Sequence, residues 1–462
     1  MMRRAGLLKS IETLAILAIS ATPLEAKAPE SAPPLPDPQG NFVRVTTESE
    51  LQAAVDNLTS GSTIVIAPGV YDLSRPVHIR NVNGVALRGE TGDWDDVVLQ
   101  GRGMSDQTVV HGVMLENAEN VLVADLTIRD VYYHPITLQA GTEAPHIYHV
   151  RLVNAGEQFI KGNTDGVKGA DNGIVEYSVM EYDTVARSYY TNGVDILRGE
   201  NWIVRHNRFR NIRSVDGKLS GPAILFWQQT RNPLVEGNTI IDCTWGIAFG
   251  LGRDDDDNIG GIIRNNFIYR NVGLDGIVDT GILVWKSPGT KVLNNTVFLN
   301  GTYSSAIEYR FPNTVDVIVR NNLTDAAVLM RDDASALVES NVTNASLSWF
   351  THPESGVLRL SSAAVDAIDK ALPDDDVPLD WDDASRPVGE FPDIGADEFV
   401  PPLAADFDES GRVDFGDFLI FASAYGTREG RPNWNPLFDL NGDRVVGFVD
   451  FLLLASLFGS TG

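Results

Sequence analysis

Val204-Arg-His-Asn207 is the first of six copies of one short phrase: an apolar branched residue, two variable residues and an asparagine. The other copies are Val235-Glu-Gly-Asn238, Ile263-Arg-Asn-Asn266, Val292-Leu-Asn-Asn295, Val319-Arg-Asn-Asn322 and Val338-Glu-Ser-Asn341. Their asparagines are spaced by 31, 28, 29, 27 and 19 residues. Such self-similarity indicates a solenoid, in which each unit buries its apolar surface against its neighbours.

The content of one repeat indicates which solenoid this is. Short apolar phrases such as Trp202-Ile-Val204 and Gly281-Ile-Leu-Val-Trp285 are separated by Gly, Asn and Asp, and no helical apolar period intervenes. Asparagine suits the recurring turn because it tolerates left-handed backbone angles, and stacked amides can bond from rung to rung. The sequence therefore predicts an all-β fold, a right-handed parallel β-helix with rungs about 4.8 Å apart.

The repeated phrase resembles the pectate-lyase-like superfamily of secreted polysaccharide-acting β-helix proteins. Two further segments are similar to its N-terminal cap helix and first coil, namely Leu51–Val55 and Gly61–Tyr71. Asp393-Ile-Gly-Ala-Asp-Glu398 is similar to its closing phrase. The resemblance covers about residues 42–400. It implies the fold more than the activity, because that superfamily includes lyases, hydrolases, epimerases and non-catalytic adhesins.

The N-terminus predicts export. Residues 1–28 carry Arg3, Arg4 and Lys9, then an apolar run from Leu14 to Ala21 and small residues, which is the layout of a secretory signal peptide. No later stretch reaches membrane length, so we expect no membrane span. Residues 29–41 are rich in proline and predict a disordered or extended spacer.

Composition narrows the range of partners. The 462-residue chain has a formal net charge of −27, which argues against a nucleic-acid ligand. Its one cysteine, Cys243, excludes an intramolecular disulfide. The segment Asp366–Glu398 is dense in aspartate, and we interpret it as a solvated cap and exit segment, with calcium binding as the alternative.

A second, different repeat begins at Asp406. The twelve-residue loops Asp406–Asp417 and Asp439–Asp450 each run into a similar apolar helix. Oxygen side chains at loop positions 1, 3, 5 and 12, with a backbone carbonyl at position 7, are what calcium requires. Residues 401–462 therefore predict a small α-helical calcium-binding domain.

This pair of loops resembles a type I dockerin, a calcium module that binds a cohesin partner. The resemblance implies a cohesin-like partner and two sets of ligands: Asp406, Asp408, Ser410, Asp414 and Asp417 in the first loop, and Asp439, Asn441, Asp443 and Asp450 in the second. Position 6 is Gly411 in the first loop but Arg444 in the second. We therefore expect a strained or weaker second site.

Aligning the second strand of successive coils places basic residues in one column. The alignment puts Lys161, Arg198, Gln228, Lys286 and Arg310 beside one another. Trp227 and Trp285 fall in the next column, with Tyr309 opposite them. A basic stripe on an acidic protein could hold an anionic chain, and aromatic faces suit sugar rings. A shift of one residue in the last rung would exchange Glu308 or Tyr309 for Arg310.

For an acidic polysaccharide, β-elimination needs a cation to neutralise the uronate carboxylate and a base to take the adjacent proton. We nominate Lys161 or Lys286 as the base and Arg198 or Arg310 as the carboxylate partner. Trp227, Gln228, Trp285 and Tyr309 are the nominated substrate-binding residues. Runners-up in adjoining loops are His134, Lys168, Arg187, Tyr189 and Tyr190.

These observations favour an exported lyase that acts on an anionic polysaccharide and carries a calcium-binding dockerin-like module. One alternative is a non-catalytic carbohydrate-binding or adhesin-like β-helix. A second is a glycoside hydrolase, because Asn163-Thr-Asp-Gly166 matches the first motif of polygalacturonases. The rest of that motif set does not follow Asp165 in order, and Asp195 with Glu308 is the other candidate carboxylate pair.

Overall fold

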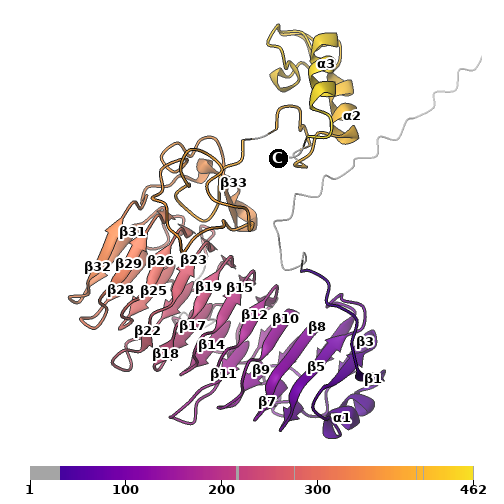
Figure 1. The fold of residues 1–462 in the computed structure, drawn as a ribbon, viewed down its shortest axis with the longest axis vertical. Coiled ribbons are helices and arrows are strands. Elements are labelled where there is room, and N and C mark those ends of the chain that lie inside the picture. The colour runs from indigo at the N-terminus through magenta and orange to yellow at the C-terminus, as the bar shows by residue number, and fades with distance from the viewer. Residues whose placement is uncertain (1–31, 215–217, 275, 402, 409, 461–462) are drawn as a thin grey trace, which may run out of the picture. The chain divides into compact units, whose positions relative to one another are not determined.

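The computed structural model describes residues 32–460 apart from 215–217, 275, 402 and 409. The described chain divides into two compact units, one ending at Pro401 and one beginning at Pro402 (Figure 1). The predicted signal peptide, residues 1–28, lies outside the described residues. No helix of the described residues is long and apolar enough to cross a membrane.

The larger unit is the predicted parallel β-helix, and its described residues form two long sheets (Figure 1). Sheet B contains, in spatial order, β4 (Val77–Arg80), β7 (His111–Glu116), β9 (His134–Leu138), β11 (Ile160–Gly162), β14 (Val194–Leu197), β17 (Ile224–Trp227), β21 (Ile247–Phe249), β25 (Ile282–Trp285), β28 (Ser305–Arg310) and β31 (Ala327–Arg331). Sheet A contains β1 (Asn41–Val45), β2 (Ser62–Ile66), β3 (Gly69–Asp72), β5 (Asn83–Gly89), β6 (Val97–Gln100), β8 (Glu119–Val131), β10 (His146–Ala155), β12 (Ile174–Glu176), β13 (Val179–Glu181), β15 (Ile203–Arg205), β16 (Arg208–Arg210), β19 (Leu234–Glu236), β20 (Thr239–Ile241), β23 (Ile262–Arg264), β24 (Phe267–Tyr269), β26 (Lys291–Leu293), β27 (Thr296–Phe298), β29 (Val317–Arg320), β30 (Leu323–Thr324) and β32 (Ala336–Glu339).

Smaller elements complete this unit. A two-stranded sheet pairs β18 (Thr230–Arg231) with β22 (Asn258–Ile259), and β33 (Phe350–His352) pairs antiparallel with β34 (Val357–Leu360). Two 3₁₀ turns, η2 (Leu347–Trp349) and η3 (Pro353–Ser355), flank β33. Helix α1 (Glu48–Asp56) covers the first coil with Leu51 and Val55, as the resemblance implied.

The six phrase asparagines form a continuous buried ladder. Each side-chain amide donates to the side-chain oxygen of the next asparagine at 2.9–3.0 Å, from Asn207 through Asn341. The predicted rung-to-rung bonding is therefore confirmed. The left-handed residue of each turn is not the ladder asparagine but the residue before it, such as His206 (φ 53°) or Asn265 (φ 52°). The ladder asparagine therefore bonds successive coils to one another, and the residue before it adopts the left-handed conformation of the turn.

The acidic segment after the last coil is pinned to the β-helix rather than solvated. Asp393, Asp397 and Glu398 of the closing phrase are buried, and Glu398 pairs with the buried Arg386 at 2.5 Å. The backbone carbonyl of Asp393 also accepts from the side chain of Asn294. The expectation of a solvated segment is thus wrong for these carboxylates, because the closing phrase packs against the outer turns of sheet A.

The proline-rich spacer is extended in its described part, residues 32–40. Arg88 Nη1 donates to the Pro36 carbonyl at 2.7 Å, and the Tyr148 hydroxyl donates to the Pro33 carbonyl. The spacer is therefore held against sheet A by two bonds to its own backbone.

The smaller unit contains α2 (Phe415–Ala424), the 3₁₀ turn η4 (Pro436–Phe438) and α3 (Phe448–Leu457) (Figure 1). Its buried core includes Val413, Phe421, Val446 and Leu454. The two helices follow the two predicted calcium loops, and Asp414 caps α2 by accepting from Gly416 N at 2.7 Å.

Candidate functional site

The strand registers correct the predicted basic column at both ends. Arg198, Gln228 and Lys286 share one column, because each follows an aligned strand end, at Leu197, Trp227 and Trp285. Lys161 instead pairs with Asp195, and Arg310 pairs with Trp285, one position earlier than Lys286. The alignment failed there because apolar alternation does not mark where a strand ends.

The three residues of the true column lie at tight turns and have local partners. Arg198, Gln228 and Lys286 all have left-handed backbones, with φ between 48° and 58°. The Arg198 guanidinium donates to Gln229, and Lys286 Nζ lies 3.2 Å from the exposed Asp255. None of these contacts brings an acid and a base together in the column.

Strand β28 places the two neighbouring candidates Tyr309 and Arg310 on opposite faces of sheet B. Tyr309 lies in register with Val284 in the interior column and belongs to the hydrophobic core. It is therefore unavailable for stacking on a sugar. The real offset is opposite to the one considered above, because Arg310 stays on the outer face in register with Trp285 and Phe311 follows it beside Lys286. Arg310 lies on the outer face, with its guanidinium 5.0 Å from the ring of Trp285 and bonded to Asp332.

Lys161 and Asp195 form the centre of the candidate site on the outer face of sheet B. Lys161 Nζ donates to Asp195 Oδ2 at 2.8 Å, and their side chains are only 8% and 2% exposed. Trp227 Nε1 donates to the other oxygen, Asp195 Oδ1, at 2.9 Å. Adjacent strands β11, β14 and β17 supply the three side chains. A buried ion pair that also holds an indole is a well-organised polar centre.

Two stacked histidines continue this centre on the preceding strands. His111 and His134 lie 5.2 Å apart between ring centroids. Burial lowers the pKa of His134 to about 3, assisted by nearby His111, and lowers the pKa of His111 to about 4. His134 Nδ1 lies 3.1 Å from the Gln158 carbonyl, which can only accept. His134 therefore carries its proton on Nδ1 and keeps a lone pair on Nε2.

The loop between β13 and β14 adds a cation and a phenol. Arg187 lies 3.4 Å from Glu157 and 4.1 Å from the ring centroid of Tyr132. Burial and the negative charges of Asp195 and Glu157 raise the pKa of Tyr190, so its hydroxyl stays protonated at neutral pH. The positive charges of Lys161 and Arg187 also lower the pKa of His134, after the larger effects of burial and of His111.

His111 is the site residue that the sequence argument missed. Its register partner is His134, on the next strand of sheet B. The sequence signal for this pair is the spacing of His111 and His134, 23 residues, which is close to the length of one coil. The six copies of the asparagine phrase do not cover this part of the chain.

The carboxylates proposed for hydrolysis are not arranged for it. Asp195 and Glu308 share a column but lie four rungs apart, about 19 Å at the usual strand spacing. A hydrolytic pair needs a separation of roughly 5 to 10 Å. Asp165 lies in an exposed turn and accepts from Val167 N and Lys168 N at 2.8 and 3.0 Å. Its role here is to shape that turn.

The four consecutive aspartates Asp254–Asp257, in the loop after β21, include a structural residue. Asp257 is fully buried, and its carboxylate accepts from the backbone of Gln228, Leu251 and Arg253 at 2.7–3.1 Å. This carboxylate fastens a loop to the end of β17.

The first calcium loop brings its predicted ligands together. Carboxylate oxygens of Asp406, Asp408 and Asp417 lie within 4.8 Å of one another. Ser410 Oγ donates to the carbonyl of Arg412, the residue at loop position 7, at 3.1 Å. Asp417 is buried and accepts from Phe407 N at 2.6 Å. An all-oxygen donor set of this kind fits calcium.

The second calcium loop repeats the side-chain-to-backbone hydrogen bonds of the first. Asp439 accepts from Asp443 N and Arg444 N, as Asp406 does from Ser410 N and Gly411 N. Asp450 is buried and accepts from Asn441 N at 3.0 Å. Arg444 has φ 69° where Gly411 has φ 78°, so the expected backbone strain is present.

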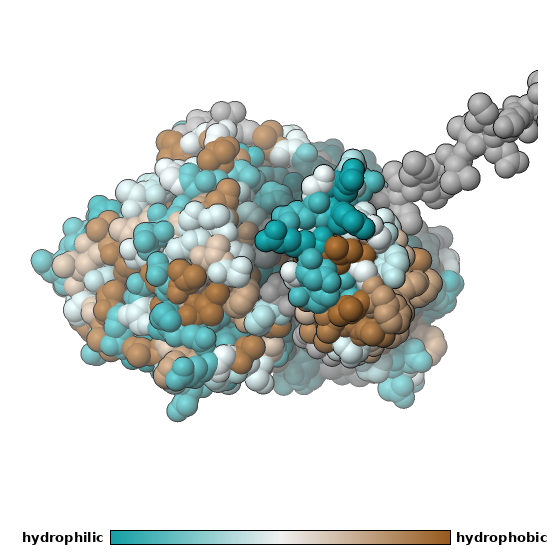
Figure 2. All heavy atoms as spheres, turned by 90° about the horizontal axis from the view of Figure 1, so that it is seen from above, coloured by the Kyte–Doolittle hydropathy of each residue, from teal (hydrophilic) through white to brown (hydrophobic). Residues whose placement is uncertain are grey.

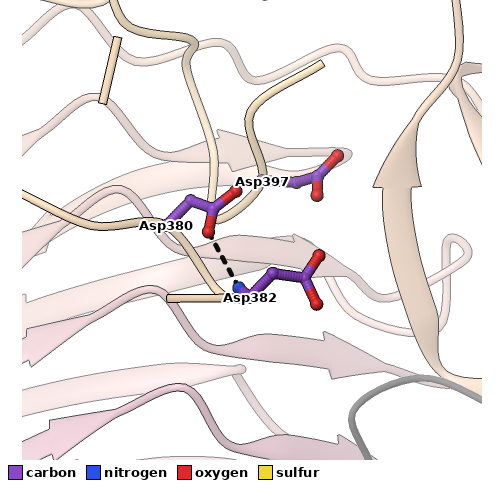
Figure 3. Close-up of side chains that lie close together, drawn as sticks. All are labelled: Asp380, Asp382 and Asp397. Atoms are coloured by element: carbon purple, nitrogen blue, oxygen red, sulfur yellow. Dashed lines mark hydrogen bonds between the residues drawn. The ribbon is translucent and has the colours of Figure 1, made fainter. Parts of the chain in front are cut away.

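A third acidic cluster lies in the closing segment of the β-helix. Asp380, Asp382 and Asp397 bring one oxygen each within 4.8 Å of the others (Figure 3). Asp380 Oδ1 accepts from Asp382 N at 2.9 Å, and Asp382 pairs with Arg359 at 2.7 Å. Burial and the two neighbouring carboxylates raise the pKa of Asp397 well above its usual value.

Comparisons with known proteins agree with the β-helix. A family model described as a right handed beta helix region matches residues 111–322. No curated protein matches the chain. Similar solved structures include an alginate lyase from Paenibacillus sp. str. FPU-7 (16% identity, TM-score 0.45, 66% of this chain and 99% of that one) and pectate lyase Pel9A (16%, 0.47, 75% and 90%). Another is PfbA, a surface adhesin of Streptococcus pneumoniae (12%, 0.41, 68% and 89%).

Proposed function

We propose that this protein binds an anionic, uronate-containing polysaccharide on the outer face of sheet B and cleaves it by β-elimination. The observation that carries the proposal is the buried Lys161–Asp195 pair beside an imidazole with a free Nε2. Lys286, Arg198 and Arg310 have no comparable surroundings in the described chain. We therefore place the site at Lys161 rather than along the whole predicted column.

The charge of this centre suits an anionic sugar. The chain as a whole carries −27, so an anion is repelled from most of the surface. Lys161 and Arg187 supply local positive charge next to His134. Because Lys161 donates to Asp195, we assign it to the uronate carboxylate rather than to proton abstraction. Arg187 is its partner in that role.

His134 is then the group that takes the proton. A uronate carboxylate bound beside the imidazole raises the pKa of His134, because negative charge favours the imidazolium. Nε2 accepts the proton from the carbon next to the carboxylate, and the bond to the leaving oxygen breaks as a carbon–carbon double bond forms. Tyr190 donates its hydroxyl proton to that oxygen. The proton count balances without a further reactant.

Ultraviolet absorbance tests the reaction directly. The full chain is incubated with pectate, alginate and glycosaminoglycan, with and without calcium, and unsaturated products absorb as they accumulate. We expect His134→Ala and Lys161→Ala each to lower kcat at least a hundredfold, with Lys286→Ala as the matched lysine control. A flat trace and no new reducing ends on every substrate would overturn the lyase proposal.

The binding-only alternative has one observation in its favour. Trp227 and Trp285 share an outer column and are partly exposed over a buried apolar cluster, and partly exposed indoles are suited to contact sugar rings. An adhesin needs that surface and no base. Polysaccharide binding that persists without any product, in the same assay, would establish this alternative.

For the smaller unit we propose calcium binding by both loops. Calcium bound there would fix the two loops against α2 and α3 through the ligands named above. Calorimetric titration of chelator-treated protein should show two sites. Asp417→Asn should remove the first and Asp450→Asn the second, while Asp366→Asn, on the exposed closing segment, should remove neither. One site lost with both variants would contradict the assignment.

We also propose that this unit binds a cohesin-like partner and that the protein is exported. Phe418, Phe421, Tyr425, Phe448 and Phe451 line an apolar hollow of about 360 Å³ in the unit. Hydrophobic residues reach the surface side by side in Figure 2, as a protein-binding module requires.

Export is tested by sequencing the N-terminus of the mature chain, with cleavage expected between Ala21 and Ala28.

A further inference from the structure

A second buried carboxylate lies further along the outer face of sheet B. Glu308 Oε1 accepts from Trp285 Nε1 at 2.9 Å, and Glu308 Oε2 accepts from Arg331 Nη1 at 3.1 Å. The Glu308 side chain is 2% exposed, whereas the Arg331 side chain is 41% exposed. The carboxylate is thus an internal anchor, and the guanidinium it holds reaches solvent.

This group mirrors the first centre in composition and order. Both groups consist of a cation, a carboxylate and an indole. In the first centre, Lys161, Asp195 and Trp227 come in that order from consecutive strands. Trp285, Glu308 and Arg331 come from consecutive strands in the reverse order. Strand β21 lies between the two tryptophans, so each cation lies at an outer end and each indole faces the middle.

Buried apolar side chains fill the space between the two centres. Leu225, Ala248 and Leu283 project outward from the three middle strands but are only 0–2% exposed, because they pack with Trp245, Trp227 and Trp285. The two tryptophans are partly exposed and lie two rungs, or about 10 Å, apart. Lys161 and Arg331 lie six rungs, or about 29 Å, apart along the column direction.

We infer that Arg331 and Trp285 form a distal subsite for the same polysaccharide, which runs along the axis of the β-helix. A guanidinium held by a buried carboxylate is oriented to pair with a uronate carboxylate, and the Arg310 guanidinium, 5.0 Å from the Trp285 ring, adds a second positive charge beside that indole. The inference rests on the proposed function and deepens it. It makes the substrate a long polyuronate that occupies both centres, so the cut falls inside the chain.

Chain length separates this arrangement from a single local site. A polymer reaches both centres, but a trisaccharide bound at Lys161 is too short to span six rungs. Loss of the distal contact should therefore weaken the binding of polymer alone. We expect Arg331→Gln to raise the Kd for polygalacturonate or alginate about tenfold, and to leave the Kd for the matching trisaccharide unchanged.

Removing Arg331 leaves Glu308 buried without a counter-charge, so a second variant protects the test. The double variant Glu308→Gln/Arg331→Gln removes the uncompensated charge and should give the same loss for polymer. Arg331→Lys should keep most of the polymer affinity. Arg44→Gln, which breaks an exposed pair with Glu90 on the first coil, removes the same charge far from the face and should have no effect.

Affinity electrophoresis and calorimetry with His134→Ala protein measure both Kd values without cleavage. Equal loss for polymer and trisaccharide, or no loss for polymer with the folded double variant, would overturn the distal subsite and leave the proposed function intact. Failure of the wild-type protein to bind either polymer would overturn the proposed function and this inference with it. Products of intermediate length early in digestion are the expected kinetic counterpart.

Discussion

Lys161 Nζ donates to Asp195 Oδ2 at 2.8 Å between neighbouring strands, and both side chains are nearly inaccessible to water. Removing one partner leaves a buried charge, which typically costs about 3–5 kcal/mol of stability. We expect Lys161→Ala to lower the free energy of unfolding in urea by that amount. Lys161→Met/Asp195→Leu should recover most of it. A destabilisation of the double variant equal to the sum of the single ones would contradict a coupled pair.

Acid should destabilise the protein through His111 and His134. Both have a folded pKa below the ordinary value of 6.5, at about 4 and about 3. The stability that their neutral forms contribute is complete above about pH 6.5 and is lost as the pH falls toward 4, because the unfolded chain binds the protons first.

Urea unfolding at pH 4.5 and 7.5 measures this effect. The wild type should lose about 5 kcal/mol more than His111→Gln/His134→Gln between the two pH values, because each unfolded imidazole titrates about two pH units above pH 4.5 and each unit corresponds to about 1.4 kcal/mol. His352→Gln, on β33, is the control and should follow the wild type. Parallel behaviour of all three proteins would show that the two imidazoles are not responsible.

The asparagine ladder should be costly to interrupt. Asn295 donates to Ile263 O and Asn322 Oδ1, and accepts from both Asn266 N and Asn266 Nδ2. Asn295→Ala leaves the buried Asn266 N without an acceptor, so we expect a loss of about 3 kcal/mol in urea unfolding. The exposed Asn57→Ala, at the end of α1, should cost less than about 1 kcal/mol. Similar losses for both would remove the special role of the ladder.

The second calcium loop should improve when its strain is removed. Arg444 is left-handed, a conformation that costs a residue with a side chain about 1 kcal/mol or more. Arg444→Gly should therefore stabilise the calcium-loaded smaller unit by about 1 kcal/mol in thermal unfolding. Gly411→Arg in the first loop is the matched reversal and should destabilise it by a similar amount. Opposite signs in either loop would show that the turn is not limiting.

The sequence predicted the solenoid because one asparagine per coil is both a local turn signal and a long-range bonding partner. It could not predict the site to the same depth. The sequence pattern aligns Lys161 with Arg198, because both follow two apolar residues. In the structure Lys161 is in register with Asp195, and apolar spacing alone does not fix that register. Arg187 and Tyr190, which the sequence offers only as runners-up, reach the centre from the loop between β13 and β14, whose path has no periodic signal. His111 lies on β7, a strand that the repeated phrase does not cover.

Because each ladder asparagine bonds to the next, the β-helix can change its length by whole coils. The amides of Asn207 through Asn341 bond only to asparagines and carbonyls of their own or an adjacent coil, so a whole coil can be inserted or removed while every other amide keeps partners of the same kind. One extra coil between Trp227 and Trp285 would move the two centres apart by one rung, about 4.8 Å, and alter neither. The number of coils between the two centres therefore sets the length of polymer that can occupy both.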